Sequence, residues 1–584
     1  MTRIAVIEKE KCHPMICGDF LCMRLCPINR TGKECIVKGE DGKAKINTEL
    51  CTGCGICPKR CPFEAIHIVN LPEALNKDPI HRYGENGFHL YNLPVPIFGK
   101  VVGIIGVNGI GKSTAIKILA GIQKPNLGKD NEASYDGLIH YFKGTEAQLF
   151  FEKVKDGKIK IGYKPQQVEM IPKRFKGTVH DLLKHADEKN KLNEIIDALE
   201  LKEFLETDIS KISGGELQRV AIAATVLKDA NLYIFDEPAS YLDIKQRIKV
   251  SKFIRELANE TTAVMVVEHD LIILDYMTDL VHIMYGEKGA YGIVSHVKVT
   301  KAGINTYLEG YLKEDNVRFR STQIKFTERP MYEHKVRPSL VSWKNVKKKL
   351  GKFQLNAEGG RISSYDVCGV LGENGIGKTT FVKILAGVLE KDSGEIDEKV
   401  KVSYKPQYLE SESDMLVAEF LKDAIKEYDA QLVKPLDLKE LFTKKLSELS
   451  GGELQKVAIA NCLSKEADLY LLDEPSAYLD VEQRLLISRL IRDLMEHEGA
   501  SCLVVDHDLL FIDYISSELI VFDGKPAREG NVRGPFDMEE GMNKFLTDLN
   551  LTMRRDQESN RPRINKPESQ MDRKQKGENK RYYT

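Results

Sequence analysis

"GVNGIGKST", residues 106–114, is a glycine-rich loop that ends in a lysine and two hydroxyl side chains, and "GENGIGKTT" repeats it at 372–380. An apolar, β-branched run precedes each loop and a helix-like run follows it, as a phosphate-binding loop between a strand and a helix requires. Closely spaced glycines let backbone N–H groups surround a phosphate, and the lysine adds a positive charge. The pair therefore predicts an α/β fold with two tandem P-loop nucleotide-binding domains.

Four further motifs recur in the same order in both halves of the chain. They are YKPQ at 163–166 and 404–407, SGGE at 213–216 and 450–453, DEP at 236–238 and 473–475, and EHD or DHD at 268–270 and 506–508. A glycine turn, an acidic pair or one histidine is more often structural than functional, but two ordered sets are typical of a functional repeat. The set resembles the nucleotide-binding domains of the ABC ATPase superfamily over about residues 75–530.

Each motif has a chemistry that suggests a role. The nucleotide-binding residues expected in the two loops are Gly106, Asn108, Gly109, Gly111, Lys112, Ser113 and Thr114, and Gly372, Asn374, Gly375, Gly377, Lys378, Thr379 and Thr380. The ligands expected for Mg²⁺ are Ser113, Gln166 and Asp236 in one half and Thr379, Gln407 and Asp473 in the other. Glu237 and Glu474 are placed to polarise the attacking water, and His269 and His507 to hold the γ-phosphate and the water in line. These residues predict an ATP hydrolase.

The resemblance also implies how the two halves cooperate. In this superfamily the SGGE signature faces the phosphate loop of the opposite domain, and both halves here lie on one chain. The signature residues are Ser213, Gly214, Gly215 and Glu216, and Ser450, Gly451, Gly452 and Glu453. The resemblance thus implies a monomer whose own two domains pair, with SYLD (240–243) and AYLD (477–480) crossing the seam.

Candidate rings for stacking on adenine differ between the halves. Tyr83 or Phe88 precedes the first loop, as a ring platform for the base should. The second half offers Phe353 or Trp343 without a clear choice.

Nine of the 12 cysteines lie in the first 61 residues, a cluster that favours metal over disulfides in a cytosolic chain. "CTGCGICPKRCP", residues 51–62, has the C-x2-C-x2-C-x3-C-P spacing of two-cluster ferredoxins, in which the fourth cysteine binds the other cluster. On that pattern two 4Fe-4S clusters are expected, one on Cys26, Cys51, Cys54 and Cys57 and one on Cys12, Cys17, Cys22 and Cys61. Cys35 is expected to be a non-ligand. Zinc is the competing interpretation, although its cysteine pairs are usually separated by longer loops.

The bulk composition limits the class of protein. At 584 residues the chain needs several cores, and 86 Lys+Arg against 87 Asp+Glu give no overall field for nucleic acid. No apolar run approaches the roughly 18 residues that cross a bilayer, and the charged N-terminus does not resemble a secretory signal. We therefore expect a cytoplasmic protein with no membrane partner.

The first half carries about 25 extra residues between its loop and YKPQ. This insertion, 135–160, interleaves aromatic and lysine residues and predicts a helical pair. It is either a surface hairpin packed on its own domain or a docking element for RNA or a protein partner.

The combination of two ferredoxin-like clusters, two fused ABC domains and a helical insertion resembles one family, the ribosome-recycling ATPases also called RNase L inhibitor proteins (ABC subfamily E). The resemblance implies that ATP-driven domain closure splits ribosomes into subunits after termination or rescue. It further implies that the protein stays on the small ribosomal subunit and its rRNA and works with a release factor or its rescue paralogue. The alternative function is an ATP-driven iron–sulfur electron-transfer protein.

Domain boundaries follow from these assignments. We expect a ferredoxin-like domain at 1–72, a first ABC domain at 73–300, a hinge at 301–330, a second ABC domain at 331–530, a second hinge at 531–555 and a tail at 556–584. The tail is charged and poor in apolar residues, which predicts disorder. Hinge residues Arg318, Arg320, Arg554 and Arg555 are expected to face rRNA.

Overall fold

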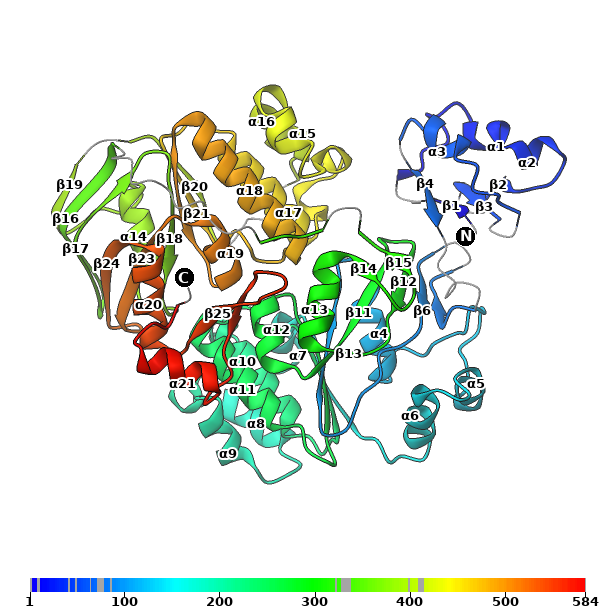
Figure 1. Cartoon of the computed structure of the whole chain (residues 1–584), viewed down its shortest axis with the longest axis horizontal. Coiled ribbons are helices and arrows are strands. Elements are labelled where there is room, and N and C mark those ends of the chain that lie inside the picture. Colours follow the sequence, from blue (N-terminus) through cyan, green and yellow to red (C-terminus); the bar gives the residue numbers. More distant parts are fainter. Residues whose placement is uncertain are drawn as a thin grey trace.

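The computed structural model describes residues 3–7, 11–39, 42–47, 50–63, 65–70, 78–84, 87–320, 323–326, 338–397, 400–407 and 414–582. It confirms the predicted α/β class with a small N-terminal unit. The N-terminal unit sits apart, beside the first large domain, and the C-terminal segment lies between the two large domains (Figure 1). The expected boundaries at 72/73 and 330/331 fall outside the described residues.

The N-terminal unit is built from short elements around the cysteines. Strand β1 (Arg3–Ile7) pairs antiparallel with β4 (Ile66–Asn70), and β2 (Ile36–Lys38) pairs with β3 (Ala44–Ile46). Its helices are α1 (Leu21–Leu25), α2 (Pro27–Arg30) and α3 (Ile56–Arg60). Its small apolar core includes cysteine side chains. So few apolar residues need an additional cross-link to hold one conformation.

The first ABC domain is a nine-stranded sheet in the order β5-β6-β12-β11-β7-β10-β9-β8, with β13 paired to β11. The strands are β5 (His81–Arg82), β6 (His89–Tyr91), β7 (Val101–Ile105), β8 (Ile161–Lys164), β9 (Leu232–Asp236), β10 (Ala263–Val267), β11 (Leu280–Glu287), β12 (Tyr291–Val294) and β13 (Lys298–Val299). The helices are α4 (Lys112–Leu119), α5 (Tyr135–Tyr141), α6 (Glu146–Lys155), α7 (Ile171–Arg174), α8 (Val179–Ala186), α9 (Leu192–Ala198), α10 (Gly214–Val226), α11 (Ile244–Glu256) and α12 (Leu271–Met277). Alternate residues of β9 enter opposite cores, Tyr233 and Phe235 on one face and Leu232 and Ile234 on the other.

The second ABC domain repeats this plan in the order β19-β16-β17-β24-β23-β18-β22-β21-β20. The strands are β16 (Ser339–Leu350), β17 (Phe353–Ser363), β18 (Val367–Leu371), β19 (Ser393–Asp397), β20 (Val402–Lys405), β21 (Leu469–Asp473), β22 (Ser501–Val505), β23 (Glu518–Lys525) and β24 (Glu529–Asp537). The helices are α14 (Lys378–Leu385), α15 (Val417–Phe420), α16 (Lys422–Glu427), α17 (Gly451–Leu463), α18 (Val481–Glu498), α19 (Leu509–Ile515) and α20 (Met538–Asp548). Cys368, Cys462 and Cys502 are buried in its cores, as small apolar side chains are.

The insertion in the first domain is the predicted helical pair, α5 and α6, and it lies at the outer edge of the molecule (Figure 1). Leu138, Phe142 and Phe151 of the pair are buried in the core of the parent domain. The apolar face of the insertion is therefore used in packing, whereas Tyr135 and Leu149 are exposed.

The C-terminal segment is folded, and the prediction of a disordered tail is wrong. It contains β25 (Met553–Arg555), β26 (Pro562–Ile564) and α21 (Gln570–Gly577), and β25 pairs with β26. Several of the charges that suggested disorder are paired inside the protein. Arg561 is fully buried and lies 3.1 Å from the Asp275 carboxylate, to which Arg563 Nη2 also donates a hydrogen bond of 3.0 Å.

This segment joins the two domains. Asp275 lies on α12 of the first domain, and the Tyr582 hydroxyl donates to Asp513 on α19 of the second domain. One apolar core contains residues of α12, of α19 and of the C-terminal segment. Composition alone misses such a segment because the partners of its charges are supplied by other elements.

The connecting segment after the first domain comprises α13 (Thr300–Glu309), β14 (Tyr311–Leu312) and β15 (Val317–Arg318). Arg320 was expected to face rRNA, but its guanidinium is nearly buried and pairs with Glu482 at the start of α18. It also lies over the Tyr307 ring, 4.6 Å from its centroid. Arg320 therefore holds the hinge against the second domain, while Arg318 is exposed.

Candidate nucleotide and iron–sulfur sites

Each acidic pair lies at the carboxyl end of a buried strand. Asp236 ends β9 and Asp473 ends β21, as the motifs predict. The next residues, Glu237 and Glu474, have φ of 47° and 49°, a left-handed backbone that turns their side chains away from the strand direction. Gln166 donates to Glu237 over 2.8 Å, and Gln407 donates to Glu474 over 2.6 Å. The two glutamines expected to bind metal thus lie against the glutamates.

Both loop lysines are buried and bind their own loops. Lys112 Nζ donates to the carbonyl oxygens of Gly106 and Val107 at 2.8 and 2.7 Å. Lys378 Nζ makes the matching bonds to Gly372 and Glu373 at 2.9 and 2.6 Å. Burial lowers the pKa of each lysine to about 8. An anion at the loop would add to the nearby carboxylates in offsetting this loss of hydration.

A donor set for Mg²⁺ is assembled in the second half. The Thr379 hydroxyl donates to Asp473 Oδ2 over 2.8 Å, so the two oxygens expected to bind the metal are adjacent. In the first half, Ser113 and Asp236 line the same cavity. Hydroxyl and carboxylate oxygens are hard ligands that suit Mg²⁺, so these residues fit the ion.

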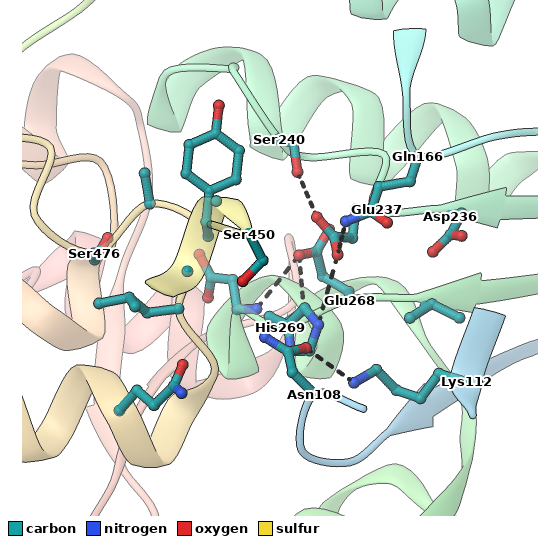
Figure 2. Close-up of a pocket in the computed structure, with 18 of the residues that line it drawn as sticks. Asn108, Lys112, Gln166, Asp236, Glu237, Ser240, Glu268, His269, Ser450 and Ser476 are labelled. Atoms are coloured by element: carbon teal, nitrogen blue, oxygen red, sulfur yellow. Dashed lines mark hydrogen bonds and ion pairs between the residues drawn. The ribbon is translucent and has the colours of Figure 1, made fainter. Parts of the chain in front are cut away.

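The loops of one half meet residues of the other half. The Asn108 N–H donates to Asp480 Oδ2 over 3.4 Å, and the Asn374 N–H donates to Asp243 Oδ2 over 2.9 Å. A cavity of about 670 Å³ is lined by the first loop together with Ser450, Gly451, Gly452 and Glu453. Figure 2 shows Lys112, Glu237 and His269 on one side of this cavity and Ser450 and Ser476 on the other. Each site is therefore composite, with both halves supplied by one chain.

The signature serines have a local task as well. Ser213 and Ser450 are the N-caps of α10 and α17, and each hydroxyl accepts a hydrogen bond from the backbone N–H of Glu216 or Glu453. Each glutamate closes a reciprocal capping box. At α17 this cap fixes the direction of a helix N-terminus that lines the cavity of the first loop.

The two histidines are held next to the glutamates. His269 Nε2 is 3.6 Å from Glu237 Oε1, and His507 Nε2 is 3.8 Å from Glu474 Oε1. Burial holds the pKa of each histidine well below its usual value. The charge of the phosphate-loop lysine adds to this effect, Lys112 for His269 and Lys378 for His507. Both rings are therefore neutral at pH 7. Among the residues that the structure describes, neither ring nitrogen of His507 has a hydrogen-bond partner, although both are buried.

The candidate adenine platforms are placed differently. Tyr83 and Phe88 line the cavity of the first loop. The ring of Phe88 packs on Gly111, and the ring of Phe353 packs in the same way on Gly377, so Phe353 is the counterpart of Phe88. Trp343 is only 3% exposed and packs edge-on against Phe381, so it belongs to the core.

Several buried residues of the sites were not predicted. Lys164 and Lys405 donate to the carbonyl oxygens of Asp236 and Asp473 over 2.9 and 2.7 Å, which fixes the strand ends. Glu268 accepts a hydrogen bond from the Ala239 N–H. The sequence did mark these residues, because they belong to the repeated YKPQ and EHD motifs. Their role depends on contacts between motifs, which the sequence does not show.

The cysteines form two groups. Cys26, Cys51, Cys54 and Cys57 line one small cavity, and Cys35 lines it too. Burial raises the pKa of Cys57 to about 12, and Cys51 and Cys54 add to the effect. Burial raises the pKa of Cys22 to about 11, with Cys12 and Cys17 near enough to contribute. Four cysteines in each expected group are the number and type of ligand that a 4Fe-4S cluster takes, and its positive charge would stabilise the thiolates. The structure does not distinguish Cys35 from the four expected ligands by location.

This fold and these sites define a twin ABC ATPase with an N-terminal iron–sulfur domain. The ABC transporter family model matches residues 97–240 and 357–477, the Fer4-like domain of RNase L inhibitor matches 2–34, and the 4Fe-4S binding domain matches 44–67. These last two matches indicate 4Fe-4S clusters and favour iron over zinc. No helix in the described part of the chain has the length and apolarity needed to cross a membrane.

Relatives extend the match to the whole chain. An uncharacterised ABC transporter ATP-binding protein of Methanocaldococcus jannaschii is 51% identical, with 100% of this chain and 97% of the relative aligned. Translation initiation factor RLI1 of Saccharomyces cerevisiae is 44% identical over 98% of this chain and 97% of its own length. The chain belongs to the RNase L inhibitor family, also called the ABC transporter E family.

Solved structures agree with this assignment. A model of ribosome-bound archaeal Pelota and ABCE1 superimposes with a TM-score of 0.95 at 52% identity, and covers 100% of this chain and 99% of that one. A crystal structure of the archaeal ribosomal stalk protein aP1 with the recycling factor aABCE1 gives a TM-score of 0.82 at 52% identity, over 87% of this chain and 99% of that one.

Proposed function

We propose that this protein is a twin ATPase that couples ATP binding and hydrolysis to domain closure, and closure to the splitting of ribosomes into subunits. The observation that carries the proposal is the composite cavity, in which Lys112 of the first half and Ser450 of the second half line one space. Nucleotide bound there contacts both halves at once. Binding energy is then available to draw the domains together, because it is realised only in the closed state.

The loop residues bind the phosphates. We assign the backbone N–H groups of both glycine-rich loops and Lys112 and Lys378 to the β- and γ-phosphates, and SGGE of the opposite half to the γ-phosphate. Ser113 and Asp236, and Thr379 and Asp473, would hold Mg²⁺, which would neutralise phosphate charge. Gln166 and Gln407 already contact the glutamates, so they can link the metal side of each site to the water side.

Hydrolysis uses one glutamate and one histidine in each site. Glu237 and Glu474 orient and polarise the attacking water as general bases. His269 and His507, being neutral, each have one N–H to donate to the γ-phosphate and hold it in line with the water. The unpartnered nitrogens of buried His507 support this role, since a buried polar group costs free energy until a ligand satisfies it.

The clusters are assigned a structural and mechanical role. Cross-linking by Cys26, Cys51, Cys54 and Cys57, and by Cys12, Cys17, Cys22 and Cys61, makes a small unit rigid enough to act as a lever. Lys11 of this unit forms an ion pair with Glu440, in the 3₁₀ helix Leu438–Leu441 of the second domain. Movement of the second domain can therefore be transmitted to the cluster unit. Electron transfer, the alternative, requires the clusters to change oxidation state during turnover.

The iron content tests the ligand assignment. Anaerobically purified protein should contain about eight iron and eight sulfide per chain, as two 4Fe-4S clusters require. Cys54→Ser should lose about half of each, whereas Cys35→Ser, the matched control in the same cavity, should keep both. Stoichiometric zinc without sulfide would contradict the clusters, and iron loss in Cys35→Ser would contradict the assignment of ligands.

The proposed partners are the ribosome and a rescue factor of the Pelota type, in the cytoplasm. This rests on the related structures, in which archaeal ABCE1 is bound to the ribosome with Pelota and to the stalk protein aP1. We further propose that the closed form stays on the small subunit and its rRNA. The α5–α6 insertion and the exposed Arg318 are available to such a surface.

Co-sedimentation tests the ribosome assignment. The Glu237→Gln/Glu474→Gln protein with ATP should pellet with isolated small subunits, because ATP that is not hydrolysed keeps the domains closed. Lys112→Ala/Lys378→Ala is the control that should stay in the supernatant. Equal recovery with small subunits, large subunits and free RNA would contradict the ribosome assignment but leave the ATPase intact.

A further inference from the structure

We propose that the two nucleotide sites recognise the base differently: the first holds it between Tyr83 and Phe88, whereas the second has Leu350 where the first has Tyr83. The first site would then prefer purine nucleotides, and the second would accept any nucleoside triphosphate with similar affinity. The inference rests on the nucleotide sites proposed above and extends them to substrate specificity.

Strand register defines which residues correspond. Leu90 packs against Gly111 of the first loop and pairs with His81, while Leu355 packs against Gly377 of the second loop and pairs with Lys348. Two residues further along each hairpin, the Tyr83 N–H donates to the Phe88 carbonyl over 3.0 Å, and Leu350 pairs with Phe353. Leu350 is therefore the counterpart of Tyr83, at the end of a shorter hairpin.

The Tyr83 ring is fixed in place at the first site. Its hydroxyl donates to Gln123 Oε1 over 2.9 Å and lies 3.2 Å from the Thr114 hydroxyl of the phosphate loop. Gln123 Nε2 is in turn 2.6 Å from His81 Nε2, and the His81 ring packs edge-on against Tyr83 at 4.7 Å. Tyr83 still has 47% of its surface exposed and lines the cavity. An ordered ring with an open face costs little entropy when a base stacks on it.

This arrangement is not repeated at the second site. Leu389 is the counterpart of Gln123. The Gln123 N–H donates to the Lys117 carbonyl, and the Leu389 N–H donates to the matching carbonyl of Lys383. Lys348, in the place of His81, forms an ion pair with Asp392 over 2.7 Å. Leu350 is 42% exposed and has no hydroxyl to anchor. The second site therefore offers one ring, Phe353, and an aliphatic side chain.

The difference affects base selectivity. Stacking of a base on an aromatic side chain contributes about 1–3 kcal/mol, and a purine overlaps a ring over more area than a pyrimidine. A leucine supplies dispersion contacts without this preference. Only part of this contribution differs between the two bases, so we expect a preference for ATP over UTP of about three- to tenfold at the first site. At the second site we expect less than about threefold.

Equilibrium binding with one loop disabled measures each site separately. Lys378→Ala isolates the first site and Lys112→Ala isolates the second, and the probes are ATP, UTP and inorganic tripolyphosphate, each with Mg²⁺. In the Lys378→Ala protein, Tyr83→Leu should weaken ATP binding about tenfold. The ratio of ATP to UTP affinity should then be close to that of the second site. Tripolyphosphate has no base, so its affinity should not change.

Gln123 is a positioning residue in this scheme. Gln123→Leu, which copies the second site, should reduce the ratio of ATP to UTP affinity. Gln123→Glu should keep that ratio, because the carboxylate still accepts a hydrogen bond from the Tyr83 hydroxyl. Equal ratios of ATP to UTP affinity at the two sites would overturn the inference. So would an equal loss of affinity for ATP and for tripolyphosphate in Tyr83→Leu. Failure of both ATP and tripolyphosphate to bind either site would instead contradict the nucleotide sites themselves.

Discussion

Replacing both Glu237 and Glu474 with glutamine is expected to reduce ATP hydrolysis by a factor of about 10² or more while ATP binding is retained, the scale of a positioned general base. Glutamine keeps the size and polarity of each side chain, so Gln166 and Gln407 can still hydrogen-bond to it. Only the ability to accept the proton of the attacking water is removed. Phosphate release measures hydrolysis, and equilibrium binding of labelled ATP measures affinity.

Two controls make this result specific. Glu466 is exposed on the second domain, and Glu466→Gln should hydrolyse ATP at the normal rate. The single variants report on each site, since Glu237 follows β9 of the first domain and Glu474 follows β21 of the second. A double variant that retains more than about a tenth of the activity would show that the glutamates are not the bases.

Replacing Asp275 with alanine is expected to destabilise the folded C-terminal segment by about 3–5 kcal/mol, because buried guanidinium groups lose their counter-charge. Asp275 is the ion-pair partner of fully buried Arg561, and it also pairs with Arg563. Removing one member of a buried ion pair leaves the other charge desolvated without compensation. Hydrogen–deuterium exchange of the amides of β25, β26 and α21 should show the loss as faster local opening.

An exposed ion pair in the same segment is the matched control. Arg573 and Glu568 are both more than two-thirds exposed, so Glu568→Ala should change local opening by less than about 1 kcal/mol. If Asp275→Ala had an effect as small as Glu568→Ala, Arg561 would not depend on this carboxylate. The two variants thus separate buried pairing from the general charge of the segment.

Local motifs made much of this protein predictable from its sequence. A phosphate loop, a helix cap and a strand that ends in an acidic residue each need only a few neighbouring residues. The strands before the loops, the helices after them and the ends of β9 and β21 at Asp236 and Asp473 therefore lie where their motifs place them. The helical pair at 135–160 is likewise encoded by its own apolar pattern.

The tertiary structure decided what depends on partners distant in the chain. The resemblance implied that the two halves meet, but the fold shows the contacts that make each site composite, Asp480 with Asn108 and Asp243 with Asn374. Only the strand register shows that Leu350 stands where Tyr83 does, because the two hairpins differ in length. The C-terminal segment is the clearest case, since its composition predicts disorder and its order comes from Asp275 and Asp513, far away in sequence. A charged side chain can be buried when a counter-charge lies next to it, and otherwise it stays in solvent. The fold supplies that partner.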